Sequence, residues 1–140
     1  MSVEIRLLRA GDDAVLSRVR SDVFDHAIDA RATAAFLADP RHHLAVAVDA
    51  DEVIGFASAV HYVHPDRATP ELWINEIGVA PSHQRQGIGR TLLGALLDRA
   101  RELGCTEAWV GTERDNVAAT HLYEALEGEA DDFVMYSFRL

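Results

Sequence analysis

The sequence predicts an α/β domain built on a mixed β-sheet, and three observations carry this prediction. Segments with strand-like alternation interleave with segments whose apolar residues recur every three to four positions. A strand-like stretch over residues 72–79 runs through a glycine-containing loop into a regular helical pattern over residues 88–103. The segment before this unit is typical of an antiparallel hairpin, which makes the sheet mixed rather than purely parallel.

The first third of the chain predicts one strand and two helices. Residues 3–8 alternate between apolar and polar side chains as a half-buried strand does. Gly11 and the two aspartates after it offer turn and capping groups for a helix that runs to about Phe24. A second short helix is expected over residues 31–38, because Pro40 cannot continue it.

The middle of the chain predicts the hairpin and the central strand. Residues 44–48 and 53–63 are rich in β-branched and small residues and are joined by a short acidic turn. Residues 64–70 hold two prolines and indicate a polar loop. The strand over residues 72–79 follows that loop.

The last third predicts two helices and two strands. The helix over residues 88–103 ends at Gly104. A short strand over residues 108–111, a helix over 116–126 and a closing strand over 133–140 follow. The predicted order is therefore β-α-α-β-β-β-α-β-α-β.

Length and composition indicate one globular domain over residues 1–140, with 49% hydrophobic and 26% charged residues. The net charge of -10 disfavours nucleic acid and anionic membranes as partners and favours cationic or neutral molecules. The N-terminal residues show no apolar run of signal-peptide length, and a single cysteine cannot form an internal disulfide, so we expect a cytoplasmic protein. The seven histidines show no metal-ligand spacing, so we expect no metal. Two of them, His83 and His121, are expected to be solvent-exposed; the alternative is that either one touches a ligand.

The loop Gln84-x-x-Gly87-x-Gly89 has the features of an anion-binding cradle. Backbone N–H groups at a glycine-rich turn into a helix point the same way, and the helix start adds partial positive charge. A pyrophosphate fits such a cradle. The glycine pattern of dinucleotide folds and the Gly-Lys-Ser/Thr of nucleotide-phosphate loops are both absent.

The stretch INEIGVAPSHQRQGIGRT, residues 74–91, resembles the GNAT N-acetyltransferase family. That family's signature is Gln/Arg-x-x-Gly-x-Gly/Ala after an apolar-Val-x-Pro turn, here Gly78-Val79-Ala80-Pro81. The element order agrees over essentially the whole chain. The resemblance implies the GNAT fold, a twisted mixed sheet with helices on both faces, with acetyl-CoA as co-substrate. It also implies direct acetyl transfer to an amine, and a homodimer.

The resemblance assigns acetyl-CoA binding to the end of the central strand and the cradle. Backbone N–H groups from Arg85 to Arg90 would hold the pyrophosphate, and both arginines add positive charge. The alternative is an ordinary helix start with basic surface residues. The expected cofactor-binding residues are Ile77, Gly78, Val79, Gln84, Arg85, Gln86, Gly87, Ile88, Gly89, Arg90, Thr91 and Asn116.

Glu76 matches the position at which many members of this family carry a general base, acting directly or through water. Strand alternation puts Ile74, Glu76 and Gly78 on one face. A carboxylate among apolar neighbours would be partly desolvated and a better proton acceptor near neutrality. The alternative is a structural carboxylate bonded to a neighbouring backbone or helix.

Asn116 and Tyr123 lie seven residues apart, two helical turns, and therefore share a face. The resemblance implies that Asn116 contacts the pantetheine or its water and that Tyr123 protonates the departing thiolate. The alternatives are a plain N-cap for Asn116 and a packed aromatic for Tyr123.

Three aspartates near the end of the first predicted helix, Asp22, Asp25 and Asp29, are candidates for binding a cationic acceptor, with Asp131 and Asp132 near the C-terminus. The alternative is a solvated acidic surface. The compact C-terminus leaves the acceptor site open or completed by a second chain. This compact ending and the stretch over residues 73–79 are similar to aminoglycoside N-acetyltransferases that modify the 3-amino group.

The leading hypothesis is an N-acetyltransferase acting on a primary amine of a small cationic acceptor, such as an aminoglycoside. An acyl-CoA-binding sensor without catalysis is one alternative. An N-acetyltransferase acting on a protein or peptide is another, because the resemblance does not fix the acceptor.

Overall fold

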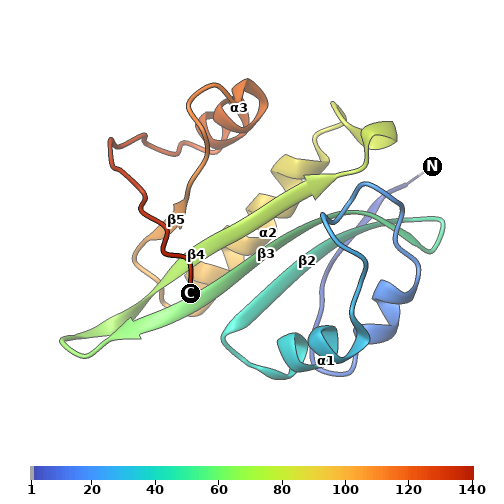
Figure 1. The fold of residues 1–140 in the computed structure, drawn as a ribbon, viewed down its shortest axis with the longest axis horizontal. Helices are drawn as coiled ribbons and strands as arrows, with labels where there is room; N and C mark the ends of the chain where they lie inside the picture. Colours follow the sequence, from blue (N-terminus) through green and yellow to red (C-terminus); the bar gives the residue numbers. More distant parts are fainter. Residues whose placement is uncertain (1) are drawn as a thin grey trace.

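The computed structural model describes residues 2–140, which form a five-stranded mixed sheet (Figure 1). The strands lie side by side in chain order, the first four pair antiparallel, and the fifth runs parallel to the fourth. The predicted α/β class and hairpin are confirmed. The strands are β1 (Glu4–Leu7), β2 (His42–Asp49), β3 (Glu52–His64), β4 (Arg67–Val79) and β5 (Ala108–Val110).

Helical segments cover both faces of the sheet. Gly55 faces helix α2, since a Cβ on it would lie 3.3 Å from the Leu92 side chain. Its neighbour Phe56 points to the opposite face, where the ring of Phe24 stacks on it at a centroid distance of 3.9 Å. The helices are α1 (Ala30–Ala38), α2 (Ile88–Glu102) and α3 (Val117–Ala125), and the 3₁₀ turns are η1 (Asp13–Ser17) and η2 (Pro81–His83).

The core lies mainly between α2 and the sheet. The apolar face of α2 is buried as its periodicity predicts, and its Leu92 and Leu96 are fully buried. Burying side chains of this size contributes roughly 1.5–3 kcal/mol each. Within residues 2–140, no helix has the length and apolar character needed to cross a membrane.

The predicted helix up to Phe24 is wrong. Only the turn η1 forms, because the Asp12 carboxylate accepts from the N–H of Arg9 instead of capping a helix. The backbone around Val19 then pairs with β3, where the N–H of Arg20 donates to the Val53 carbonyl at 2.9 Å. Residues 18–29 therefore cross the sheet as an irregular segment.

Two further predictions are wrong. Residues 64–70 are mostly strand rather than loop: β3 ends at His64, β4 begins opposite it at Arg67, and residues 65–66 form the turn between them. Residues 133–140 form no strand, and the segment is exposed. The chain therefore ends without the last predicted strand.

Candidate active site

Strands β4 and β5 pair along only part of their length. Their contact runs from Leu72 opposite Ala108 to Ile74 opposite Val110. Beyond this point β4 continues alone to Val79, with β3 on its other side. We call residues 67–74 the paired half of β4 and residues 75–79 its open half. The unpaired backbone edge of the open half can accept an extended ligand that carries amide groups.

A β-bulge marks the boundary between the two halves. Glu76 pairs with Ser58 and Ile74 pairs with Ala59, so Asn75 is one extra residue on β4. Cross-strand partners share a face, and neighbours in β3 point to opposite faces. Ile74 and Glu76 therefore lie on opposite faces of the sheet, and the prediction that they share one is wrong.

The bulge also changes the environment of Glu76. Ile74 is buried, whereas Glu76 is exposed on the face that carries Phe56 and the irregular segment 18–29. The expected desolvation of this carboxylate among apolar neighbours is therefore wrong. Glu76 lines the pocket that is described below.

Two residues with positive φ shape the turn into α2. Gly87 is the N-cap of α2 with φ 78°, a conformation that glycine adopts without strain, and no side chain caps this helix end. The first N–H groups of α2 have no intrahelical partner, and Arg85, at φ 64°, adds a second left-handed residue to the turn. The Thr91 hydroxyl donates to the Gly87 carbonyl at 3.0 Å and holds the turn in place.

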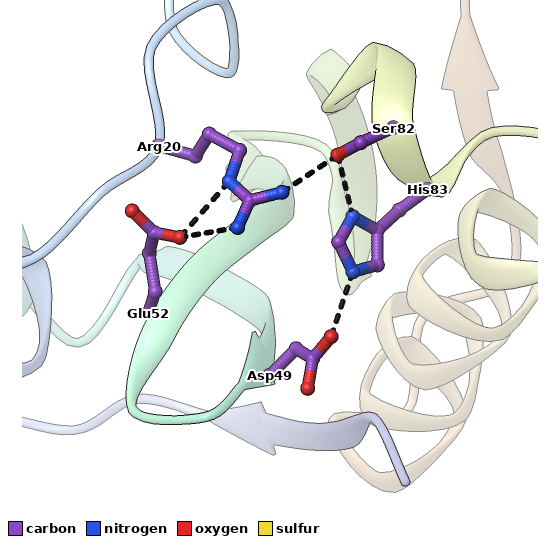
Figure 2. Close-up of polar contacts among 5 residues, drawn as sticks. All are labelled: Arg20, Asp49, Glu52, Ser82 and His83. Carbon is purple, nitrogen blue, oxygen red and sulfur yellow. Dashed lines mark hydrogen bonds and ion pairs between the residues drawn. The ribbon is translucent and has the colours of Figure 1, made fainter. Parts of the chain in front are cut away.

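A chain of polar contacts anchors the loop before the cradle (Figure 2). His83 bonds through Nε2 to an Asp49 carboxylate oxygen at 2.7 Å and through Nδ1 to the Ser82 hydroxyl at 2.8 Å. The Arg20 guanidinium donates to the same hydroxyl at 2.8 Å and pairs with Glu52 at 2.7 Å. Since a carboxylate only accepts, His83 Nε2 carries a proton.

We call these five residues, Arg20, Asp49, Glu52, Ser82 and His83, the loop anchor. The expectation that His83 is solvent-exposed is wrong, because 13% of its side chain is accessible. Gln84, the first residue of the cradle motif, donates from its side chain to the Val79 carbonyl at 3.1 Å. The loop is thus fixed to both the β2–β3 turn and the end of β4.

A pocket of about 580 Å³ opens where β4 and β5 diverge. Residues predicted for acceptor binding, for catalysis and for cofactor binding all line it. The predicted residues that line it are Asp22, Asp25, Glu76, Ile77, Gly78, Val79, Gln84, Gly89, Asn116 and Tyr123.

The rest of the cradle lies outside this pocket. Arg85, Gln86, Gly87, Arg90 and Thr91 are exposed at the surface, and the Ile88 side chain is buried in the core. The Ile88 side chain is therefore part of the core rather than of a ligand-binding surface.

Tyr123 and Asn116 face the pocket from α3. Burial raises the pKa of the Tyr123 phenol, which keeps its proton in place at neutral pH. The Asn116 side chain accepts from the Ala119 N–H at 3.0 Å, so the N-cap role is confirmed. Its amide nitrogen remains a potential donor on the pocket side.

The acidic candidates divide into two groups. Asp22 and Asp25 line the main pocket, and Asp25, Asp29 and Glu76 line an adjoining hollow of about 300 Å³. One Asp29 oxygen caps α1 by accepting from the Ala32 N–H at 2.9 Å. Asp131 and Asp132 line neither hollow, and Asp132 pairs with Arg114 at 2.6 Å.

Gly78 has a packing function that its sequence position did not reveal. A Cβ at this position would lie 2.6 Å from the Val23 carbonyl oxygen. The absence of a Cβ lets the irregular segment approach β4 and place Asp22 and Asp25 beside Glu76 in the pocket wall.

Sequence reasoning also missed the loop anchor, because its members are distant in sequence. Within residues 2–140, no three His, Cys, Asp or Glu side chains meet as a metal site would require.

Comparisons with known proteins identify the family of this chain. The model of the acetyltransferase (GNAT) family matches residues 13–128. The chain is 37% identical over 89 residues to streptothricin acetyltransferase of Streptomyces lavendulae, covering 64% of this chain and 44% of that protein. It is 40% identical over 70 residues to the ribosomal protein bS18-alanine N-acetyltransferase of Escherichia coli K12, covering 50% and 45%. The chain thus spans less than half the length of these curated relatives.

Two solved structures share the fold. An aminoglycoside acetyltransferase, meta-AAC0020, from an uncultured soil metagenomic sample in complex with sisomicin gives a TM-score of 0.84 at 21% identity, over 99% of this chain and 95% of that one. The aminoglycoside N-acetyltransferase AAC(6′)-Iy in complex with CoA gives 0.77 at 22%, over 99% and 95%. Because the family model matches residues 13–128, most of the chain, this chain belongs to the GNAT acetyltransferase family.

Proposed function

We propose that the chain is an N-acetyltransferase that moves an acetyl group from acetyl-CoA directly to a primary amine of a small cationic acceptor. One observation carries the proposal: the open half of β4, the Gln84 end of the cradle and Tyr123 line the same pocket. A strand edge, an anion-binding helix start and a proton donor are the parts that such a transfer needs.

The residues present fit acetyl-CoA. The uncapped start of α2 offers N–H donors for the pyrophosphate, and Arg85 and Arg90 lie exposed beside it. The unpaired edge from Ile77 to Val79 offers backbone groups to the pantetheine amides. Acetyl-CoA would supply the activated acetyl thioester.

The chemistry uses two side chains of the pocket. The amine nitrogen forms a bond to the acetyl carbonyl carbon as the carbon–sulfur bond breaks. Glu76 removes the proton that the ammonium must lose, directly or through water. Tyr123 gives its phenolic proton to the departing thiolate, and the raised pKa of this phenol keeps the donor protonated at neutral pH.

The acceptor class follows from the acidic wall of the pocket. Asp22, Asp25 and Glu76 place three carboxylates there, in a chain of net charge -10. Aminoglycosides carry several ammonium groups, and the similar proteins named above include a streptothricin acetyltransferase and two aminoglycoside acetyltransferases. The name of the second solved structure specifies the 6′ position, whereas the sequence resemblance was to enzymes acting on the 3-amino group. Both positions therefore belong in the test.

The test is release of free thiol from acetyl-CoA, with the acceptor-free rate subtracted. Acceptors would be aminoglycosides with free 3-amino or 6′-amino groups, streptothricin, a polyamine and a peptide with N-terminal alanine. We expect turnover with the polycationic small molecules. Asp25→Asn should raise KM for the amine several-fold with acetyl-CoA binding unchanged. Glu76→Gln should move the activity to higher pH, because the amine must then lose its proton to solvent.

Two outcomes would replace the proposal. Tight acetyl-CoA binding in calorimetry without thiol release from any acceptor would indicate a sensor module. Release with the peptide and not with the small amines would indicate a protein N-acetyltransferase.

A further inference from the structure

Three members of the loop anchor form a hydroxyl–imidazole–carboxylate series (Figure 2). Ser82 Oγ lies 2.8 Å from Nδ1 of His83, and Nε2 of the same ring lies 2.7 Å from an Asp49 carboxylate oxygen. Serine hydrolases activate their nucleophile with these three groups in this order, and the arrangement recurs on unrelated folds. The acetyl transfer proposed above uses none of the three in its chemistry.

The tautomer of His83 suits proton transfer from Ser82. A carboxylate only accepts, so Nε2 carries the proton of the neutral ring and Nδ1 carries the lone pair. The Ser82 hydroxyl therefore donates to Nδ1, which can take the proton when the oxygen attacks. In the usual triad the two ring nitrogens are exchanged, but either one can serve as the base. The Asp49 contact holds the ring with its basic nitrogen toward the serine.

A cation also contacts the Ser82 oxygen. The Arg20 guanidinium donates to Oγ at 2.8 Å, and Glu52 holds the guanidinium in place at 2.7 Å. Positive charge beside the hydroxyl stabilises the alkoxide that develops as the proton leaves. Loss of the Ser82 proton is thus favoured by a base on one side and by a cation on the other.

The series runs from the surface to the interior. Ser82 is exposed, whereas only 13% of each side chain is accessible for His83 and for Asp49. A nucleophile has to be reachable, and the base behind it is better shielded from water. Ser82 lines neither of the two hollows described above, so no deep pocket would select the substrate. This setting favours small esters that have a good leaving group.

We propose that Ser82 is a nucleophile outside the acetyl-transfer site and hydrolyses small activated carboxylic esters. Its Oγ forms a bond to the carbonyl carbon while its proton moves to His83 Nδ1. The ester carbon–oxygen bond breaks, and the leaving group takes that proton. Water then attacks the acyl-serine, and its proton passes through His83 to Ser82, which releases the carboxylic acid. The proposal does not depend on the acetyl transfer, because it needs no acetyl-CoA.

The first test labels the wild-type chain, without acetyl-CoA, with a fluorophosphonate, which bonds to an activated serine oxygen as fluoride leaves. Trypsin cuts after arginine, and the peptide over residues 68–85 holds one serine, Ser82. Ser137, an exposed serine on another tryptic peptide, is the control within the same molecule. We expect Ser82 to react at least about 10²-fold faster, the lower end of the contribution of a general base. Equal rates would overturn the proposal, and this comparison needs no substitution.

The second test is hydrolysis of para-nitrophenyl acetate. The chain contains no lysine, so side-chain amines do not contribute to the background. Ser82→Ala should remove most of the protein-dependent rate, and Asp49→Asn should lower the rate about tenfold or more, because the imidazole loses its orientation. Ser137→Ala is the matched control and should behave as wild type. An unchanged rate in Ser82→Ala would assign the hydrolysis to other nucleophiles, and an unchanged rate in Asp49→Asn would refute the three-residue relay.

Discussion

The two halves of β4 use the same backbone for different purposes. In the paired half, Glu71, Leu72 and Ile74 are buried, and β4 lies between β3 and β5. In the open half every residue is exposed or half-buried, and one edge has no strand partner. In the paired half, the backbone hydrogen bonds to β5 stabilise the fold. In the open half, the backbone groups on that edge remain available to a ligand, and the candidate chemistry lies there.

Polar side chains show the same contrast. Near the paired half, buried polar groups bond to one another: Glu71 bonds to His64, and His43 bonds to His61 at 2.7 Å. The hydrogen bond from His64 holds the pKa of the Glu71 carboxyl below its usual range. In the open half Glu76 is exposed toward the pocket. Polar groups thus fix the paired half and remain accessible in the open half.

The largest expected effect is on the chemistry at the open half. Tyr123→Phe removes the proton donor and keeps the ring, so kcat should fall by roughly 10²-fold or more, the usual contribution of a general acid. Acetyl-CoA affinity, measured by calorimetry, should stay within twofold. A variant with nearly wild-type kcat would show that Tyr123 is a packed aromatic and that the thiolate leaves without its help.

The second prediction compares the halves by the same kind of truncation. Leu72→Ala in the paired half should lower the free energy of unfolding by about 3 kcal/mol, because Leu72 is fully buried. Ile77→Ala in the open half should cost only about 1 kcal/mol, since its side chain is partly exposed.

Urea denaturation measures both losses, and steady-state kinetics on the folded proteins should show the reverse order. KM for acetyl-CoA should rise in Ile77→Ala and stay unchanged in Leu72→Ala. Equal stability losses, or a KM effect confined to Leu72→Ala, would remove the distinction between the halves.

The third prediction concerns pH and the buried histidines at the paired end of the sheet. Burial, reinforced by His61, Arg99 and His42, lowers the pKa of His43 to about 4 from 6.5. The folded state therefore favours neutral His43, so its contribution is fully present above pH 6.5 and is lost as pH falls toward 4. The loss should amount to roughly 2–3 kcal/mol.

Urea unfolding of wild type and His43→Phe between these pH values tests this prediction. The variant should show a shallower fall in stability toward acid pH, because it lacks the titrating ring. His26→Gln, at an exposed histidine, is the control and should follow wild type. Parallel curves for wild type and His43→Phe would mean that other groups cause the acid sensitivity.

The sequence predicted those features that depend on local patterns. The apolar spacing of α2, the N-cap at Asn116 and the glycine positions of the cradle are local, and the structure has each of them. The seven-residue spacing of Asn116 and Tyr123 likewise placed both in one pocket.

Features that depend on tertiary contacts could not be predicted in this way. The bulge at Asn75 is one extra residue between Ile74 and Glu76, and strict alternation of side chains does not reveal it. Residues 13–24 have a helical pattern, but pairing of the Val19 region with β3 replaced the helix. Residues 133–140 have the alternation of a strand, but no neighbouring strand in the chain pairs with them.

The loop anchor is the part of the site that the sequence concealed most fully, since His83 and Asp49 are 34 residues apart. It carries the smallest effect that we predict. His83→Ala would free the loop between β4 and the cradle, so KM for acetyl-CoA should rise about threefold to tenfold, the value of one or two hydrogen bonds. Because the hydrogen bonds and ion pairs of the anchor do not involve Glu76 or Tyr123, kcat should stay within twofold.

Two variants separate this positioning function from general destabilisation. His121→Ala alters an exposed histidine on α3 and should leave KM unchanged. His83→Gln can still donate toward Asp49 and should recover part of the affinity. A double-mutant cycle of His83→Gln and Asp49→Asn should give a coupling energy of about 1 kcal/mol in acetyl-CoA binding. Zero coupling would mean that the Asp49–His83 contact holds the β2–β3 turn without shaping the cradle, and cofactor affinity would then depend on Gln84 and the helix start alone.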